Sequence, residues 1–167
     1  CDVTNEKELT RIIDEINDEF GLLDIFCSNA GILSLGNEQT SNEVWNKNWN
    51  LHVMSHVFAA KKLIPEMLKR GSGYFVNTSS AAGLLSHIDS VTYSTTKHAA
   101  IGFAEWIAIT YGKQGIGVSI LCPQAVETAM TKGREKEVSA LDGMMKPEEL
   151  ALDVIKAIKG ETFLISP

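Results

Sequence analysis

Long apolar runs are missing from this sequence of 167 residues. No stretch reaches the roughly 18–20 apolar residues that a helix needs to cross a bilayer, and no signal peptide opens the chain. Basic clusters are also missing, because the net charge is −6 and basic residues gather at most in pairs such as Lys61-Lys62. These absences argue against membrane and nucleic-acid partners. We expect a cytoplasmic protein.

Cysteine is scarce, with Cys1, Cys27 and Cys122 as the whole set. The number is odd and each cysteine lies in an apolar, strand-like run, so we expect buried free thiols and no disulfides. Such cysteine usage is typical of a reducing compartment. The four histidines lack the spacing of zinc ligands. No metal site is predicted.

Helical and strand-like patterns alternate along the chain. Hydrophobic residues make up 44% and charged residues 22%, which suits a packed single domain. Thr4 is the expected N-cap of a helix over residues 4–20 that stops at Gly21. Further helices are expected over 44–70, 93–111 and 147–159, and strands over 22–27, 74–77, 118–122 and 163–165. The alternation predicts an α/β fold, a doubly wound parallel sheet between two helix layers.

Polar or turn-forming residues follow several of these strands directly. Asn29, Ser80 and Pro123 stand at or just beyond the expected strand ends. In parallel sheets the ligand lies beyond the carboxyl ends of the strands. We therefore expect these three residues to lie together at a ligand site.

Tyr93 and Lys97 form a Tyr-x-x-x-Lys motif 13 residues after Ser80. A tyrosine and a lysine four positions apart share one face of a helix. A nearby ammonium favours the phenolate, so Lys97 is expected to lower the pKa of Tyr93 and suit it to proton transfer. Ser80 could hold the substrate oxygen. Together these groups are suited to interconverting an alcohol and a ketone.

Four segments in this order resemble the short-chain dehydrogenase/reductase family, and the resemblance spans residues 1–167. They are Cys1-Asp2-Val3-Thr4, Ser28-Asn29-Ala30-Gly31, the stretch from Gly73 to Ser80 with Tyr93 and Lys97, and Pro123 to Thr128. The resemblance implies a Rossmann-like domain and an oxidoreductase that transfers hydride with NAD or NADP.

The resemblance also assigns roles to individual residues. It implies that Tyr93 is the general acid/base, that Lys97 lowers its pKa and holds the nicotinamide ribose, and that Ser80 orients the substrate oxygen. Tyr93 and Lys97 would also line the cofactor, together with Asp2, Val3, Asn29, Ala30, Gly31, Pro123, Val126 and Thr128.

The chain departs from the family pattern at its start. The family's glycine-rich turn, which binds pyrophosphate at a helix N-terminus, has no counterpart here. Two βα units would be missing, roughly 60 residues at ~30 per unit. We therefore expect residues 1–167 to be part of a larger NAD(P)-binding domain, and expect the longer protein to be the form that binds cofactor well.

Two further departures lie at site positions. Where the family has a tetrad asparagine, 13 residues before Pro65, this chain has His52. A neutral histidine can donate and accept hydrogen bonds, so a water relay to Lys97 could survive, and we count His52 as a candidate catalytic residue. A packed structural histidine is the competing interpretation. Gln124 replaces the usual glycine after Pro123 and is interpreted as a tolerated loop substitution.

The resemblance also suggests partners. Segments that wall the substrate pocket in this family here carry Leu84, Leu85, Met130, Leu141, Met144 and Met145, which favours an apolar alcohol or ketone. The helices over 44–70 and 93–111 correspond to the family's dimer contact, so a homodimer or homotetramer is expected. His98 is interpreted as structural and His87 as solvated.

Two other functions remain open at this point. One is a truncated, non-catalytic relative that acts as a dimerisation or binding module, favoured by the missing glycine turn and His52. The other keeps the fold and the Tyr-x-x-x-Lys motif but performs dehydratase or epimerase chemistry. The intact Ser80, Tyr93 and Lys97 favour the oxidoreductase.

Overall fold

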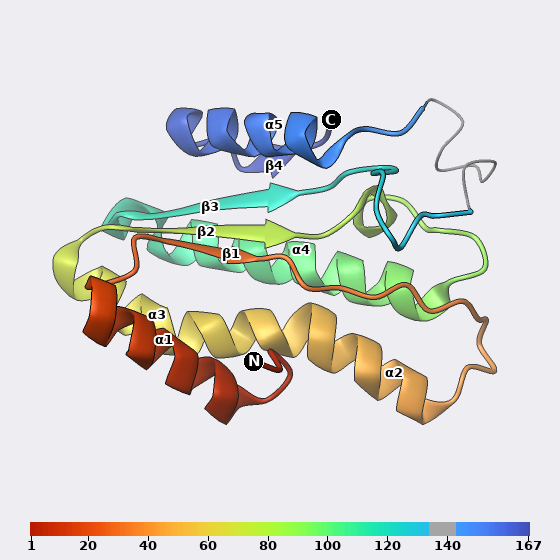
Figure 1. The fold of residues 1–167 in the computed structure, drawn as a ribbon, viewed down its shortest axis with the longest axis horizontal. Helices are drawn as coiled ribbons and strands as arrows, with labels where there is room; N and C mark the ends of the chain where they lie inside the picture. Colours follow the sequence, from red (N-terminus) through yellow and green to blue (C-terminus); the bar gives the residue numbers. More distant parts are fainter. Residues whose placement is uncertain (134–142) are drawn as a thin grey trace.

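The computed structural model describes residues 1–133 and 143–167. Its strands are β1 (Ile25–Ser28), β2 (Gly73–Thr78), β3 (Ile116–Leu121) and β4 (Leu164–Ile165), all parallel, in the spatial order β1-β2-β3-β4. The helices are α1 (Glu6–Phe20), α2 (Asn42–Trp49), α3 (Ser55–Arg70), α4 (Val91–Tyr111) and α5 (Pro147–Gly160). Figure 1 shows α5 on one face of the sheet and the other helices on the opposite face. The predicted three-layer, Rossmann-like fold is confirmed.

Several predicted element boundaries were wrong by a few residues. Asn5, and not Thr4, caps α1, because its side chain accepts hydrogen bonds from the first-turn amides of Lys7 and Glu8. Thr4 bonds to Asp2 instead. β1 begins three residues later than expected, at Ile25. Such ends depend on local hydrogen bonds that an apolar pattern does not specify.

The predicted long helix over 44–70 contains an unpredicted π-helical turn. Between α2 and α3 lies η1 (Asn50–Met54), where the amide of Ser55 donates to the carbonyl of Asn50. A π-turn inserts one residue and rotates the side chains that follow it. His52 lies within this turn and is fully buried.

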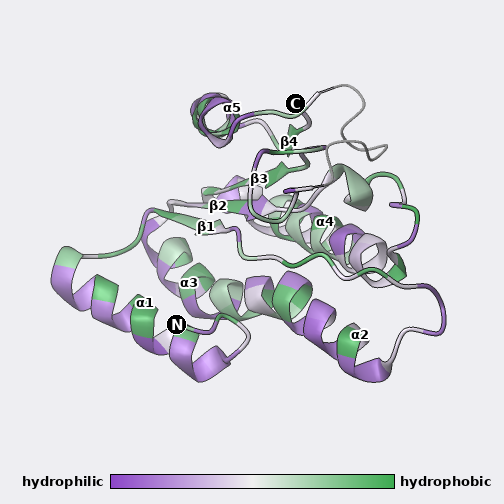
Figure 2. Ribbon diagram, turned by 45° about the vertical axis from the view of Figure 1, so that its right-hand side comes forward, coloured by the Kyte–Doolittle hydropathy of each residue, from purple (hydrophilic) through white to green (hydrophobic). Residues whose placement is uncertain are grey.

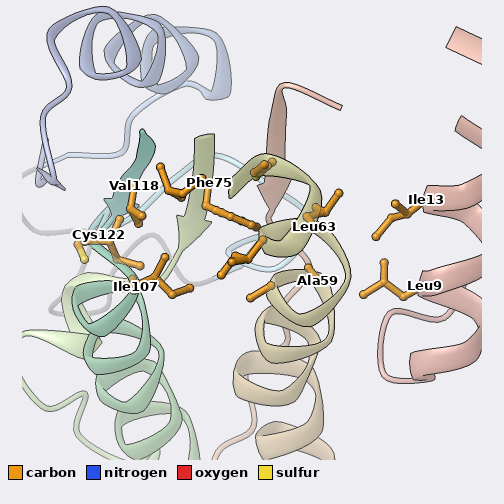
Figure 3. Close-up of a cluster of buried hydrophobic side chains, with 14 residues drawn as sticks. Leu9, Ile13, Ala59, Leu63, Phe75, Ile107, Val118 and Cys122 are labelled. Carbon is orange, nitrogen blue, oxygen red and sulfur yellow. The ribbon is translucent and has the colours of Figure 1, made fainter. Parts of the chain in front are cut away.

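The main core lies between the sheet and the helices below it (Figure 3). Phe75 of β2 is 1% exposed and Ile107 of α4 is fully buried. α1 adds Leu9 and Ile13 against α3, and its hydrophilic face points outward, visible as purple in Figure 2. This packing fixes α3 and α4 beneath the sheet, and with them the side chains at its carboxyl edge.

The expectation of three buried thiols was wrong for two of them. Cys122 is buried, whereas Cys1 and Cys27 are exposed, although all three are free as predicted. β1 is the edge strand of the described sheet, so Cys27 and Ile25, the latter 43% exposed, have no neighbouring strand on one side. The apolar pattern of residues 22–27 indicated a buried strand, and the prediction of buried thiols did not take the unpaired edge of that strand into account. No helix in the described ranges is long and apolar enough to span a bilayer.

Candidate active site

The carboxyl ends of the first three strands meet at one edge of the sheet. The strands are in register there, with Ser28 beside Asn77 and Thr78 beside Leu121. Past β2 the chain stays paired with the segment after β3, as the amide of Ala81 donates to the carbonyl of Pro123 over 2.8 Å. The hydroxyl of Thr78 donates to the Asn29 side chain over 3.0 Å. Asn29, Ser80 and Pro123 therefore lie together, as expected from their places after strands.

Tyr93 and Lys97 lie in the first two turns of α4 and face this edge. The Lys97 ammonium donates to the backbone carbonyl of Thr78 over 3.0 Å and lies 5.5 Å from the centroid of the Tyr93 ring. Lys97 is 3% exposed. Burial disfavours the ammonium and lowers the pKa of Lys97 to about 8, while the nearby Cys122 acts in the opposite direction. Lys97 is thus a buried amine whose pKa lies well below its ordinary value.

The expected lowering of the Tyr93 pKa by Lys97 was wrong for this structure. Burial raises the pKa of the Tyr93 phenol, and a hydrogen bond from the Ser80 side chain acts in the opposite direction. The geometry explains the difference, because the ammonium is bonded to Thr78 and lies over the ring. Tyr93 is therefore protonated at neutral pH in this structure and can act as an acid.

Ser80 stands at the turn between β2 and α4. Its hydroxyl caps the 3₁₀-helix η2 (Ala81–Gly83) by accepting the amide of Ala82 over 3.1 Å. Its own proton makes a long contact of 3.5 Å with the carbonyl of Pro123. A contact of this length is weak. The Ser80 proton can be redirected to a substrate oxygen.

His52 belongs to the same cluster. Its Nε2 accepts the amide of Ile32 over 3.1 Å, and its Nδ1 lies 2.8 Å from the hydroxyl of Thr96. Its ring meets the Tyr93 ring edge-on, with centroids 5.5 Å apart. Burial, then the charge of Lys97, lowers the pKa of His52 to about 3. Both ring nitrogens of His52 already have hydrogen-bond partners. A water relay from the His52 side chain to Lys97, as considered from the sequence, would therefore have to replace one of these bonds.

Gly31 brings the Ser28–Gly31 segment against the catalytic candidates. A Cβ built on Gly31 would lie 3.5 Å from both His52 Nε2 and Lys97 Nζ. Gly31, His52 and Lys97 therefore surround one small volume. Ala30 and Asn29 beside it are exposed, which leaves this edge open to a ligand.

Four residues that were predicted to line the cofactor make contacts away from Tyr93 and Lys97. The Asp2 carboxylate accepts the amide and hydroxyl of Thr4, and Val3 packs against the main core. Val126 pairs with Met145, and the amide of Thr128 donates to the Thr131 hydroxyl. No described contact joins these residues to Tyr93 or Lys97. Their contact with a cofactor remains a prediction.

The remaining candidates are mostly exposed or half-buried. Gln124, Leu84, Leu85 and Met130 are exposed, and Met144 and Met145 are half-buried. Leu141 lies outside the described residues. His98 bonds through Nδ1 to the carbonyl of Ser94, in line with a structural role, and His87 bonds through Nδ1 to the carbonyl of Ile88. Both histidines line an open cavity of about 640 Å³ beside the start of α4.

Sequence reasoning missed four residues that shape the site. Thr96 bonds to His52, and Thr78 bonds to both Lys97 and Asn29. Gly83 packs against the Lys97 carbonyl, and His56 is buried near Lys97. Thr78 follows a strand-like run and could have been found by that signal. The pairing of Thr96 with His52 depends on the π-turn, which had no signal.

Comparisons with known proteins identify the family of this chain. The short chain dehydrogenase family model matches residues 1–139. Short-chain dehydrogenase/reductase family 16C member 6 of Bos taurus is 31% identical over 173 residues, covering 100% of this chain and 54% of that protein. An uncharacterized oxidoreductase of Thermotoga maritima is 35% identical over 145 residues, and the match covers 86% of this chain and 55% of that protein. The chain thus spans about half the length of these curated relatives.

A solved structure gives the same result for the fold. A short-chain dehydrogenase from Streptomyces avermitilis superposes with a TM-score of 0.87 at 25% identity, over 99% of this chain and 68% of that one. The superposition covers the sheet and the helices on both of its faces.

Proposed function

This chain belongs to the short-chain dehydrogenase family, and from that premise we propose that it interconverts an alcohol and a ketone or aldehyde by hydride transfer with NAD or NADP. The proposal depends on one observation, the cluster in which the Lys97 ammonium, the Tyr93 ring and the Ser80 hydroxyl meet at the strand ends. In this proposal Tyr93 exchanges a proton with the substrate oxygen and Ser80 holds that oxygen.

The buried amine of Lys97 fits a bound nicotinamide cofactor. An ammonium has three N–H donors, and one hydrogen bond from Nζ, to Thr78, is found among the described residues. Two donors of a side chain that is 3% exposed are left for a ligand. The cofactor would supply the hydride, and Lys97 would hold its ribose beside Gly31. Solved relatives in complex with NADH and with NADP show both cofactors on this fold.

Replacing Tyr93 with Phe tests the proposal. The substitution removes the hydroxyl and keeps the ring contact with His52. We expect turnover to fall by roughly 10²–10⁴-fold, the usual contribution of a general acid/base, while cofactor affinity changes little. Tyr111→Phe, at the far end of the same helix, is the matched control. Activity that survives Tyr93→Phe would refute this mechanism, and an inactive wild type would favour the binding-module alternative.

The substrate and assembly are further parts of the proposal. Leu84, Leu85 and Met130 present exposed apolar surface, which supports an apolar alcohol or ketone. Trp106 and Ile109 of α4 are 54% and 76% exposed. Large exposed apolar side chains on one helix are typical of an interface, so we also propose a homodimer or homotetramer through α2, α3 and α4.

A further inference from the structure

His52 has a hydrogen-bond partner at each ring nitrogen. Nε2 lies 3.1 Å from the amide nitrogen of Ile32, which directly follows Gly31. Nδ1 lies 2.8 Å from the hydroxyl oxygen of Thr96, the residue before Lys97. The imidazole therefore bridges the Ser28–Ile32 segment and helix α4.

The partners determine where the protons are. A backbone amide can only donate, so Nε2 carries no proton. Thr96 has a single hydroxyl proton, and that proton is directed to the carbonyl of Thr92 over 2.8 Å, with the carbonyl of Tyr93 farther away at 3.2 Å. The Thr96 oxygen is thus left as an acceptor, and Nδ1 carries the imidazole proton. A charged imidazolium would place an N–H against the Ile32 amide.

We propose that Thr96 is a positioning residue, whose hydroxyl fixes His52 as the neutral Nδ1–H tautomer and so ties the Ser28–Ile32 segment to the helix that carries Tyr93 and Lys97. This inference deepens the proposed function and rests on it for its kinetic part. With the bridge in place, the Tyr93 ring is held edge-on against His52 at 5.5 Å. The imidazole of His52 then sets the distance between the Ser28–Ile32 segment and the proposed acid/base, Tyr93.

Burial and charge support the proposal. Thr96 and His52 are both completely buried, so water cannot replace either partner. The titratable groups that bear on His52 are Lys97 of α4 and His56 of α3, and both disfavour its charged form, as does burial. The neighbouring Thr95 is exposed and provides a matched position without this contact. A lost hydroxyl at Thr96 would leave a buried N–H without an acceptor.

The tautomer can be measured without any activity. We would record side-chain ¹⁵N spectra of the protein, in the longest form in which it is made, and assign His52 as the signal lost in His52→Asn. The expected wild-type spectrum at pH 7 shows a protonated Nδ1 and a bare Nε2, retained in Thr96→Ser and Thr95→Val and changed in Thr96→Val. A protonated Nε2 or an imidazolium in the wild type would overturn the proposal. Because reading the wild-type spectrum needs only the His52→Asn assignment, poor folding of Thr96→Val leaves this test intact.

Kinetics then separates positioning from general structural support. In Thr96→Val we expect kcat to fall roughly ten- to a hundredfold, as for a small misplacement of reacting groups, with little change in the substrate KM. Thr96→Ser should restore kcat, and Thr95→Val should leave it unchanged. A folded Thr96→Val with wild-type kcat overturns the positioning role. If the wild type itself turns over no alcohol or ketone, the proposed function fails, while the spectrum still decides the tautomer.

Discussion

The Lys97 ammonium is bonded to the backbone carbonyl of Thr78 at the end of β2, over 3.0 Å. Thr78 also reaches Asn29 through its hydroxyl, so one strand end connects the helix α4 with the strand β1. Nζ lies 5.5 Å from the centroid of the Tyr93 ring. Burial has the largest effect on the pKa of Tyr93 and raises it.

Replacing Lys97 with Met should separate activity from stability. The change removes the amine that we propose for the cofactor, and we expect kcat to fall about a hundredfold or more. It also removes a buried charge whose burial is unfavourable. The free energy of unfolding, from urea denaturation, should therefore stay level or rise. Lys113→Met, on the exposed turn after α4, is the control. A large loss of stability with activity retained would contradict both the proposed role of Lys97 in activity and the unfavourable burial of its charge.

The direction of the Tyr93 shift predicts opposite pH profiles for the two reaction directions. Ketone reduction needs a protonated phenol, and burial raises the pKa of Tyr93 above its ordinary value. Reduction should thus hold through neutral pH and decline as pH rises through that pKa. Alcohol oxidation needs the phenolate and should accelerate over the same rise. Between pH 6 and 10, below that pKa, kcat/KM should stay level for reduction and rise for oxidation, and an oxidation rate that falls with rising pH would contradict the assignment.

Sequence reasoning predicted the layered fold and the strand-end location of the site, because apolar periodicity and parallel topology dictate both. It also picked the Tyr93–Lys97 pair. It missed what depends on tertiary context. The π-turn at Asn50–Met54 was not predicted, and His52, which lies in it, contacts Thr96. Likewise, burial decides the direction of the Tyr93 pKa shift, and the bond from Lys97 to the backbone carbonyl of Thr78 carries no sequence signal.

Replacing His56 with Leu should make the protein less sensitive to acid. His56 is 3% exposed, and its Nδ1 has no hydrogen-bond partner among the described residues. Burial, then Lys97, lowers the pKa of His56 to about 3 from an ordinary 6.5. As pH falls below 6.5, His56 therefore becomes protonated in the unfolded chain but stays neutral in the native state. Each such histidine lowers stability by up to about 1.4 kcal/mol per pH unit.

The measurement is urea denaturation at pH 7.5 and pH 5.0, above the range in which most carboxylates titrate. Wild type should lose stability between these values, and His56→Leu should lose less. His87→Leu is the control, because His87 is only half-buried whereas His56 is buried. Equal pH slopes in wild type and His56→Leu would contradict the buried neutral histidine.

Charge placed on the outer face of α4 should disrupt the proposed oligomer. Ile109 is 76% exposed, and Trp106 is exposed beside Tyr111 with ring centroids 5.7 Å apart. Ile109→Asp would bury a carboxylate in an interface but would be harmless on a free surface. Light scattering should give a dimer or tetramer for wild type and a monomer for the variant. Leu152→Asp, on the exposed face of α5 with 57% exposure, is the control. A monomeric wild type would contradict the prediction.

Two glycine substitutions should differ in their effect on the site. A Cβ on Gly83 would come within 2.8 Å of the Lys97 carbonyl and 2.5 Å of the Ser79 hydroxyl. Because Lys97 O belongs to the backbone of α4, η2 would have to move away from the helix, and Ser80 would move with it away from Tyr93. We expect Gly83→Ala to lower both kcat and the melting temperature. Gly102, in α4, has open space where its Cβ would stand.

Gly102→Ala is therefore the matched control, and alanine should stabilise the helix there by about 1 kcal/mol. Its kcat should stay at the wild-type value, because Gly102 lies beyond the turns that carry Tyr93 and Lys97. Thermal unfolding and steady-state kinetics on both variants check the pair. If Gly83→Ala kept full activity, the close packing of η2 on α4 could not be what sets the Ser80 position. Because both substitutions add the same single methyl group, a lower kcat in Gly83→Ala alone would be due to the close contacts of Gly83 with Lys97 and Ser79.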